Sequence, residues 1–237
     1  MGPAGMTVPG RAFPLLVIVP VRSADEDAPL FLSQIGEGTV LDRTFADGER
    51  QRENGDVTLM VTTDDARIRD AAEARDAGWH VRLRDENETA GGYFHAIARA
   101  SELAADATGK RFGSVLVLEP SHPFRPRGLI GNALDLYGRQ SELETVVAVV
   151  REYGNLWTED DHQGLNRIHT PEGRNFFREM AGLCLLTSPT AIKGTTAMGA
   201  NVGFVVVEEQ WALIDIHEHD DVELARRFHS FLSSGTA

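Results

Sequence analysis

The sequence has one cysteine and almost no lysine. A single cysteine, Cys184, excludes an intrachain disulfide, which is typical of proteins from a reducing compartment, so we expect a cytoplasmic location. Cys184 lies in the apolar run AGLCLLTSP, which favours a buried structural thiol over a reactive nucleophile. The only lysines are Lys110 and Lys193, so arginine supplies nearly all of the positive charge.

Basic residues and long apolar runs are also scarce. The chain has 23 Lys and Arg against 36 Asp and Glu, a net charge of −13 and a pI near 5.0. This balance excludes broad binding to nucleic acid or to anionic membranes, although a small basic pocket remains possible. No apolar stretch approaches the ~20 residues of a membrane span. The beginning, MGPAGMTVPGRAF, lacks the apolar core of a signal peptide, and we expect residues 1–12 to be a flexible tail.

Strand-like and helix-like segments alternate along the 237 residues. The run LLVIVPV (15–21) is uninterrupted in its apolar character, which is typical of a parallel strand that is buried on both faces. Further strands are expected at 57–63, 79–84, 114–120, 145–152, 181–188, 203–209 and 212–218, and helices at 39–53, 64–78, 93–109, 127–140 and from Asp220 to the end. The pattern predicts one α/β domain at 13–235, a mainly parallel sheet with helices on both faces.

The segment 153–180 has no clear period. It contains aromatic residues and arginines, including Trp157, Phe176, Phe177 and Arg174, and we expect it to leave the sheet. An interface between two copies of the chain is one use for such residues, and contact with substrate is another.

Four stretches resemble one known family when they are taken in order: VIVPVRS, VTLMVTTDDARIRDAAEARDAGWHVRLR, LVLEPSHPFRPRGLIGNALDLY and ALIDIHEHDDVELARRF. They are similar to motifs of the cytidylyltransferases that activate sugar acids, the CMP-sialic acid (acylneuraminate) and CMP-Kdo synthetases. The resemblance covers roughly residues 14–232. It implies a Rossmann-like, GT-A-like nucleotidyltransferase fold, a homodimer, and a reaction in which CTP and a small acceptor give a CMP-sugar and pyrophosphate with the help of a divalent metal ion, Mg²⁺ or Mn²⁺.

The resemblance also implies a set of site residues. Arg22 and Ser23 would bind the nucleotide's phosphates and Arg84 its base, while Asp215 and His217 would hold the metal, with Arg22 and Asp215 as the catalytic pair. Substrate contacts are expected from Glu119, Ser121, His122, Arg125 and Arg174. Several of these residues also have a purely structural alternative: Arg22 could pair with nearby acids, Arg125 could cap or pair with the next helix, and His217 could simply pack at the end of the expected strand.

Three positions depart from the family's pattern. Where the family has Gly and basic residues, this chain has Asp25, Glu26 and Asp27. A carboxylate ~6 Å from a phosphate oxygen would cost about 3 kcal/mol at an effective dielectric constant near 20. Three interpretations follow. The loop does not hold a triphosphate, or a metal ion lies between its carboxylates and the phosphates, or the loop is simply a solvated acidic loop. Glu119 replaces a Gln, which favours a neutral or amino-bearing acceptor, and His217 replaces an Asp, which favours Mn²⁺ or another transition ion over Mg²⁺.

These departures leave two main hypotheses. The first is a diverged cytidylyltransferase, and the second is a catalytically impaired relative that acts as a binding or regulatory subunit. Metal-assisted hydrolysis at Asp215, His217 and Glu119 is a third. The loop from Ser23 to Leu32 decides between the first two: arginines such as Arg43, Arg125 or Arg174 that converge on it would favour catalysis.

Overall fold

The computed structural model describes residues 10–22, 30–85, 91–154, 156–159, 164–168 and 175–234. Its strands are β1 (Leu15–Val21), β2 (Gln34–Ile35), β3 (Gly38–Thr39), β4 (Val57–Thr63), β5 (His80–Leu83), β6 (Ser114–Val117), β7 (Thr145–Glu152), β8 (Trp157–Glu159), β9 (Leu165–Arg167), β10 (Phe176–Glu179), β11 (Leu185–Thr187) and β12 (Val202–Val206). Its α-helices are α1 (Val40–Arg50), α2 (Ala66–Glu73), α4 (Tyr93–Thr108), α5 (Leu129–Arg139) and α6 (His219–Ser233). Short 3₁₀ helices are η1 (Gly10–Ala12), η2 (Leu30–Leu32), η3 (Gln51–Glu53), η4 (Pro189–Ala191) and η5 (Gln210–Leu213).

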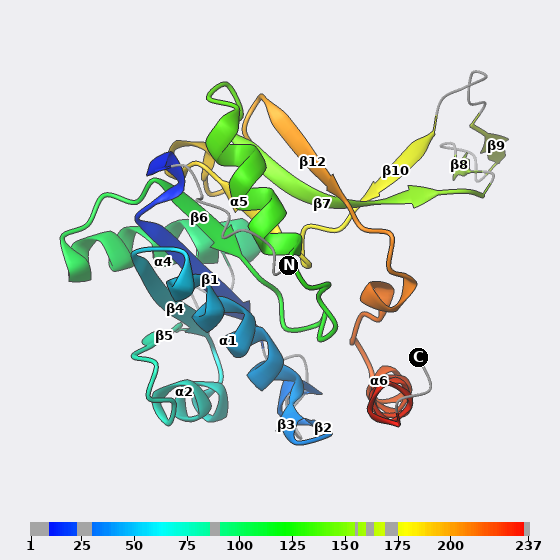
Figure 1. Cartoon of the computed structure of the whole chain (residues 1–237), viewed down its shortest axis with the longest axis horizontal. Helices are drawn as coiled ribbons and strands as arrows, with labels where there is room; N and C mark the ends of the chain where they lie inside the picture. The colour runs from blue at the N-terminus through cyan, green and yellow to red at the C-terminus, as the bar shows by residue number, and fades with distance from the viewer. Residues whose placement is uncertain are drawn as a thin grey trace, which may run out of the picture.

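One sheet forms the centre of the molecule, in the order β10-β7-β11-β6-β1-β4-β5, with β12 also paired to β7 (Figure 1). The pairs β1–β4, β1–β6, β4–β5 and β12–β7 are parallel, whereas β11 and β10 run antiparallel to their neighbours. Every residue of β1 is buried, as its unbroken apolar sequence predicts, and every residue of β4 is buried as well, including its three threonines. The expected α/β fold with a mainly parallel sheet is confirmed.

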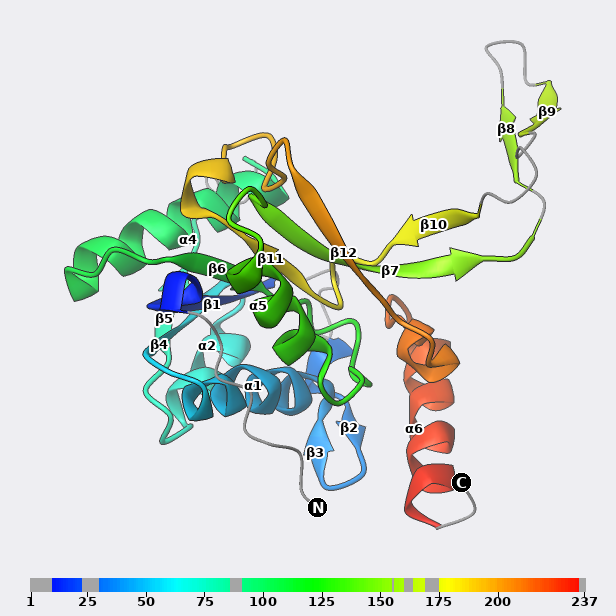
Figure 2. The ribbon, with the colours of Figure 1, turned by 45° about the horizontal axis from the view of Figure 1, so that its top comes forward.

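Helices cover both faces of this sheet (Figure 2). Side chains of α1, α2 and α5 belong to one core cluster, and side chains of α4 belong to the cluster on the other face. Local sequence sets the helix ends: Thr39 and Asp42 form a capping box on α1, Asp65 caps α2, and Gly109, at φ +66°, ends α4. No helix in the described part of the chain is long and apolar enough to cross a membrane.

Three expectations need correction. The segment from Ala212 to Glu218 is not a strand: it is the end of η5 followed by extended chain outside the sheet. Residues 10–12 are not a flexible tail, because Arg11 donates hydrogen bonds to the carbonyls of Tyr137, Ser141 and Leu143; residues 1–9 lie outside the described ranges. The segment 153–180 rejoins the sheet at its end, where β10 pairs with β7.

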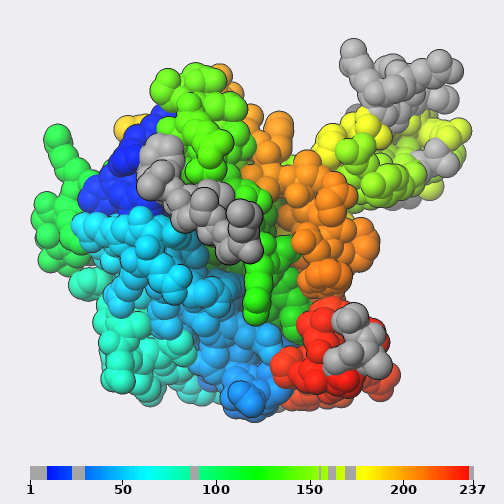
Figure 3. Space-filling view, viewed as in Figure 1, coloured from blue at the N-terminus to red at the C-terminus, as the bar shows by residue number. Residues whose placement is uncertain are grey.

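Beyond that pairing, β7 and β10 continue into an arm that ends in the β8–β9 pair and projects from the body (Figures 1 and 3). All residues of β8 and β9 are exposed. Helix α6 packs on η2 and β2 through a small third core that includes Ile35, Phe124, Ile216 and Val222. The arm therefore adds nothing to the described core, whereas α6 closes one end of it.

Candidate functional site

A pocket of about 320 Å³ lies at the carboxyl ends of β1 and β6, next to the first turn of α4. This edge is where ligands bind in open α/β sheets. Its lining residues are Pro20, Val21, Arg22, Phe31, Arg84, Gly92, Tyr93, Ala96, Glu119, Pro120, Ser121 and His217. The fold thus brings five of the residues singled out from the sequence, Arg22, Arg84, Glu119, Ser121 and His217, into one cavity.

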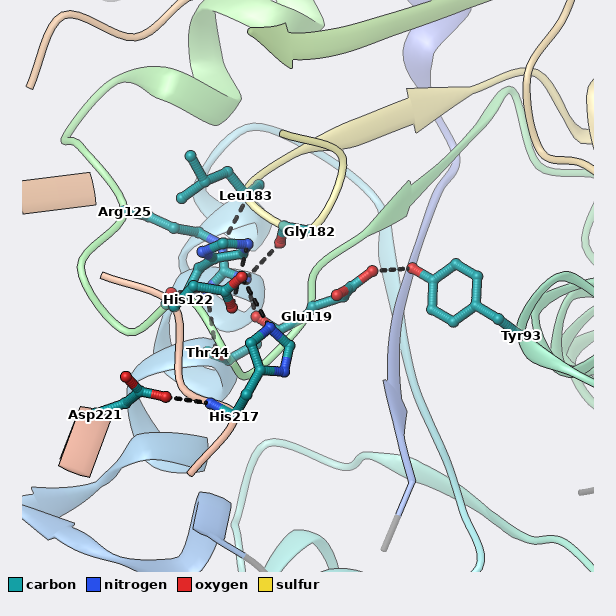
Figure 4. Close-up of polar contacts among 10 residues, drawn as sticks. Thr44, Tyr93, Glu119, His122, Arg125, Gly182, Leu183, His217 and Asp221 are labelled. Carbon is teal, nitrogen blue, oxygen red and sulfur yellow. Dashed lines mark hydrogen bonds and ion pairs between the residues drawn. The ribbon is translucent and has the colours of Figure 1, made fainter. Parts of the chain in front are cut away.

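Glu119 and Tyr93 face each other across this pocket (Figure 4). The Tyr93 hydroxyl donates a hydrogen bond of 2.5 Å to Glu119 Oε1. Desolvation of the hydroxyl, together with the charge of Glu119, raises the pKa of Tyr93, so the proton stays on the tyrosine. One oxygen of Glu119 is thus already used as an acceptor within the pocket.

Asp215 and His217 lie side by side although their segment is not a strand. Asp215 Oδ2 is 2.9 Å from His217 Nε2. Between them, Ile216 is fully buried and donates its backbone N–H to the Ser121 carbonyl at 2.8 Å, which leaves its two neighbours on the opposite side of the chain. Asp221 then accepts hydrogen bonds from the N–H groups of His217 and Glu218 at the start of α6. The backbone hydrogen bond between Ile216 and Ser121 thus helps to place Asp215 and His217 side by side, where the sequence predicted a strand.

His122 is buried behind this pair. Its Nε2 lies 3.7 Å from Asp215 Oδ1, and burial lowers the pKa of His122 to about 4, only partly offset by Asp215. Within the described ranges, Ser121 Oγ, His122 Nδ1 and Asp215 Oδ1 are buried atoms without a hydrogen-bond partner. Buried polar atoms normally have partners, so this cluster is a place where water, an ion or a ligand is expected.

Asp215 and His217 are the residues that would hold a divalent ion, because carboxylate oxygen and imidazole nitrogen are both ligands for ions such as Mn²⁺. In the structure their side chains bond to each other, with 2.9 Å between Asp215 Oδ2 and His217 Nε2. Across the described residues, no three His, Cys, Asp or Glu side chains form a complete metal site. Two protein ligands are nevertheless sufficient where a nucleotide's phosphates supply the rest.

Arg125 is structural in its geometry. Its side chain is only 2% exposed, and its guanidinium donates to the carbonyls of Glu119, His122, Gly182 and Leu183 and to Thr44 Oγ1 (Figure 4). Arg125 Nη1 also lies 3.4 Å from Asp47 Oδ2. It does not reach the pocket, so it shapes the loop that bears Glu119 instead of touching substrate.

Arg84 is largely engaged as well. Its guanidinium donates to the carbonyls of Val21 and Thr62, which ties the ends of β1 and β4 together while part of the residue lines the pocket. Arg22 is exposed at the pocket edge. Arg43 bonds instead to the Ile35 carbonyl and His229. Neither Arg43 nor Arg125 lines the pocket, and Ser23, the acidic loop Asp25–Asp27 and Arg174 lie outside the described residues.

Tyr93 is the functional candidate that the sequence did not reveal. It is the first residue of α4, directly after Gly91 and Gly92, and Gly92 has φ +83°. A glycine pair before a helix at this edge of the sheet was a usable signal. Cys184 proves to be fully buried, and burial raises its pKa to about 12, so the expected structural thiol is confirmed.

Comparison of the sequence with protein-family models and with curated proteins gives no match. The structure, however, is similar to solved cytidylyltransferases. The 4-diphosphocytidyl-2C-methyl-D-erythritol synthase from Anaerococcus prevotii DSM 20548 has a TM-score of 0.65 at 12% identity, over 91% of this chain and 98% of that chain. CMP:2-keto-3-deoxy-manno-octonic acid synthetase, solved in complex with CTP, has a TM-score of 0.61 at 12% identity, over 93% of this chain and 99% of that chain.

The 2-C-methyl-D-erythritol 4-phosphate cytidylyltransferase from Thermus thermophilus gives a TM-score of 0.58 at 17% identity, over 90% of this chain and 98% of that chain. Each similarity extends over nearly the whole of both chains. The nucleotidyltransferase fold expected from the sequence motifs is therefore confirmed. At these identities the similarity concerns the fold, and the chemistry must be argued from the site.

Proposed function

We propose that this chain is a nucleotidyltransferase that transfers CMP from CTP to a hydroxyl group of a small acceptor, with release of pyrophosphate. The observation that carries the proposal is the pocket at the carboxyl ends of β1 and β6, which combines Arg22, Glu119 and His217 in a fold shared with cytidylyltransferases. Asp215 is bonded to His217 at the edge of this pocket.

The proposed roles follow from charge and position. Arg22, exposed at the pocket edge, binds phosphate oxygens, and the wall formed by Arg84 receives the base. Asp215 and His217 hold a divalent ion, Mg²⁺ or Mn²⁺, which supplies charge neutralisation at the phosphates. The acceptor's hydroxyl oxygen forms a bond to the α-phosphorus while the bond to the pyrophosphate oxygen breaks, and the hydroxyl proton passes to solvent.

The acceptor binds beside Glu119 and Tyr93. The Tyr93 hydroxyl group already donates its hydrogen bond to Glu119, so the two side chains offer only acceptor oxygens to a ligand. Such a pair favours hydroxyl or ammonium groups and repels a carboxylate. We therefore propose a neutral or amino-bearing acceptor, bound by Glu119 and Ser121.

Assembly and location belong to the same proposal. The arm exposes Trp157 and Phe177, at 57% and 46% of their surface, which suits a contact between two copies of the chain. We propose a homodimer formed through the arm, in the cytoplasm.

Thermal unfolding with nucleotides tests the proposed site. CTP with Mn²⁺ or Mg²⁺, at ~100 times its Kd, is expected to add about 2.7 kcal/mol of stability. For a chain of this size the midpoint would rise by roughly 5–10 °C. EDTA and the Asp215→Asn variant should abolish the metal-dependent part, and ATP, GTP and UTP serve as controls for the base. No shift with any nucleotide would overturn the proposal.

A second function is favoured by one observation. Arg43 and Arg125 were expected to join Arg22 in binding phosphate. Both are bonded to protein carbonyl groups instead, and neither lines the pocket. A binding or regulatory subunit would bind CTP without releasing pyrophosphate. Pyrophosphate release in the presence of neutral and amino-bearing sugars separates this function from the first.

A further inference from the structure

A second, larger cavity lies beside the candidate site but shares no lining residue with it. Its volume is about 840 Å³. Its walls are formed by α1, η3, the loop after Ser121–His122, the start of α5, Trp211 of η5 and Leu232 of α6. The lining residues are Arg43, Ala46, Asp47, Arg50, Gln51, Glu53, Asn54, Pro123, Phe124, Arg125, Pro126, Arg127, Gly128, Ile130, Gly131, Trp211 and Leu232. We call this cavity the α1–α5 groove.

The α1–α5 groove is positively charged in a strongly negative protein. Four arginines face two carboxylates, Asp47 and Glu53, whereas the whole chain has a net charge of −13. Asp47 is buried and is paired with both Arg50 and Arg125, so its charge is already compensated. The remaining excess of positive charge attracts an anion.

Arg127 is the cation most available to a ligand. It is exposed and has no hydrogen-bond or ion-pair partner anywhere in the described part of the chain. It directly precedes Gly128, the N-cap of α5, at which no side chain makes a capping hydrogen bond. The positive end of the α5 dipole thus adds to the charge of Arg127 at one wall of the groove.

The groove also offers aromatic surface. Trp211 is 44% exposed, and its ring stacks on Phe228 with 6.2 Å between ring centroids. The side-chain amides of Gln51 and Asn54 line the same cavity. The exposed Trp211 ring, beside these amides and the guanidinium group of Arg127, suits a ligand that has both a ring and a phosphate.

We propose that the α1–α5 groove binds a phosphorylated small molecule with a planar ring, the chemistry of a mononucleotide. A nucleic-acid polymer is disfavoured, because the net charge of −13 would repel a long polyanion outside the groove. The inference is independent of the function proposed for the Glu119 pocket, since the two cavities have no residue in common.

Arg125 connects the two cavities. Its guanidinium contacts Asp47 in the groove wall and the carbonyl groups of Glu119 and His122 in the loop of the candidate site. A ligand that displaces Arg50 from Asp47 would therefore act on the same network that positions Glu119.

Trp211 fluorescence tests the proposal on the full chain, with AMP as probe and with adenosine and inorganic phosphate as its parts. AMP should change the fluorescence in a saturable way, and adenosine should bind at least about tenfold more weakly. The Trp211→Phe variant should remove the signal, because Trp79 is buried and Trp157 lies on the arm.

Two charge reversals locate the binding. Arg127→Glu should weaken AMP binding by about tenfold or more, whereas Arg111→Glu, at another exposed arginine that does not line the groove, should stay within about twofold. Circular dichroism checks the folding of each variant, and Arg127→Gln replaces a variant that does not fold. No saturable change with AMP, or equal effects of the two reversals, would overturn the proposal.

Discussion

At the scale of single residues, Arg125 shows how a side chain can serve a site without touching a ligand. Its fully engaged guanidinium joins α1, the Glu119 loop and the carbonyls of Gly182 and Leu183. In sequence it follows the loop motif SHPF, where a substrate contact was a reasonable expectation. Burial decides the matter, because a guanidinium that is 2% exposed cannot be shared with solvent or substrate.

Arg125→Met should therefore lower stability strongly. The variant leaves several buried carbonyls without a donor, and the expected loss is about 3 to 5 kcal/mol in urea unfolding. Arg139→Met is the matched control: its side chain is 67% exposed and pairs with Asp135 on the same helix, so it should cost less than about 1 kcal/mol. Equal losses in the two variants would contradict the buried network.

His122 gives the site a measurable pH dependence. Because burial lowers its pKa to about 4, the folded state stays unprotonated between pH 6.5 and 4 while the unfolded chain takes up a proton. Stability should consequently fall as the pH drops through this window, by about 3 kcal/mol in total at 1.36 kcal/mol per pKa unit.

The difference between wild type and His122→Gln isolates this effect from other titrating groups. In metal-free buffer, urea unfolding at a series of pH values should show a smaller pH slope in the variant. His80→Gln, on exposed β5 surface, should keep the wild-type slope. A variant whose slope is unchanged would show that His122 titrates normally in the folded protein.

At the scale of elements, close packing fixes the Glu119 loop against the turn between β10 and β11. Gly182 lies so near that an added Cβ would be 2.7 Å from His122 Cδ2 and 2.9 Å from Glu119 Oε2. The same glycine's carbonyl accepts hydrogen bonds from Glu119 N and Arg125. A turn from the antiparallel half of the sheet thus positions residues at the end of a parallel strand.

Gly182→Ala should disturb both stability and the site. Overpacking is expected to cost about 1–3 kcal/mol and to displace Glu119 from Tyr93. Gly154→Ala, where the added Cβ meets open space, is the matched control and should change stability by less than about 0.5 kcal/mol. Unfolding midpoints and a crystal structure of the Gly182 variant would check both parts; an unmoved Glu119 would contradict the second.

At the scale of the whole molecule, the arm and the body are separable. The β8–β9 pair is exposed on every residue, whereas Glu152 and Phe176 pair directly where the arm leaves the sheet. Replacement of residues 153–175 by Asn-Gly would close β7 and β10 into a two-residue hairpin.

This shortened chain should keep its core stability and lose its partner. Because the described arm adds no buried core residue beyond β10, we expect the unfolding midpoint to move by less than about 4 °C. If the arm forms the proposed homodimer, analytical ultracentrifugation should show a dimer for the full chain and a monomer for the shortened one. Two dimers, or two monomers, would contradict the dimer contact.

The sequence predicted most elements of the sheet but not the chain before α6. The apolar run of β1 is so continuous that burial on both faces follows directly. The run ALIDIHE has the same alternation as a strand, yet it finds no neighbour in the sheet, because β12 already occupies the edge of β7. Pairing depends on which edges are free, and local sequence does not contain that information.

The sequence alone determined the α/β class, the two-sided helix layers and the burial of Cys184, because periodicity and hydrophobicity are local properties. Only the tertiary structure decided that Tyr93 meets Glu119, that Arg125 is enclosed and that His122 lies behind Asp215. Those contacts join residues from separate elements, and their geometry is set by how the helices and loops pack on the sheet.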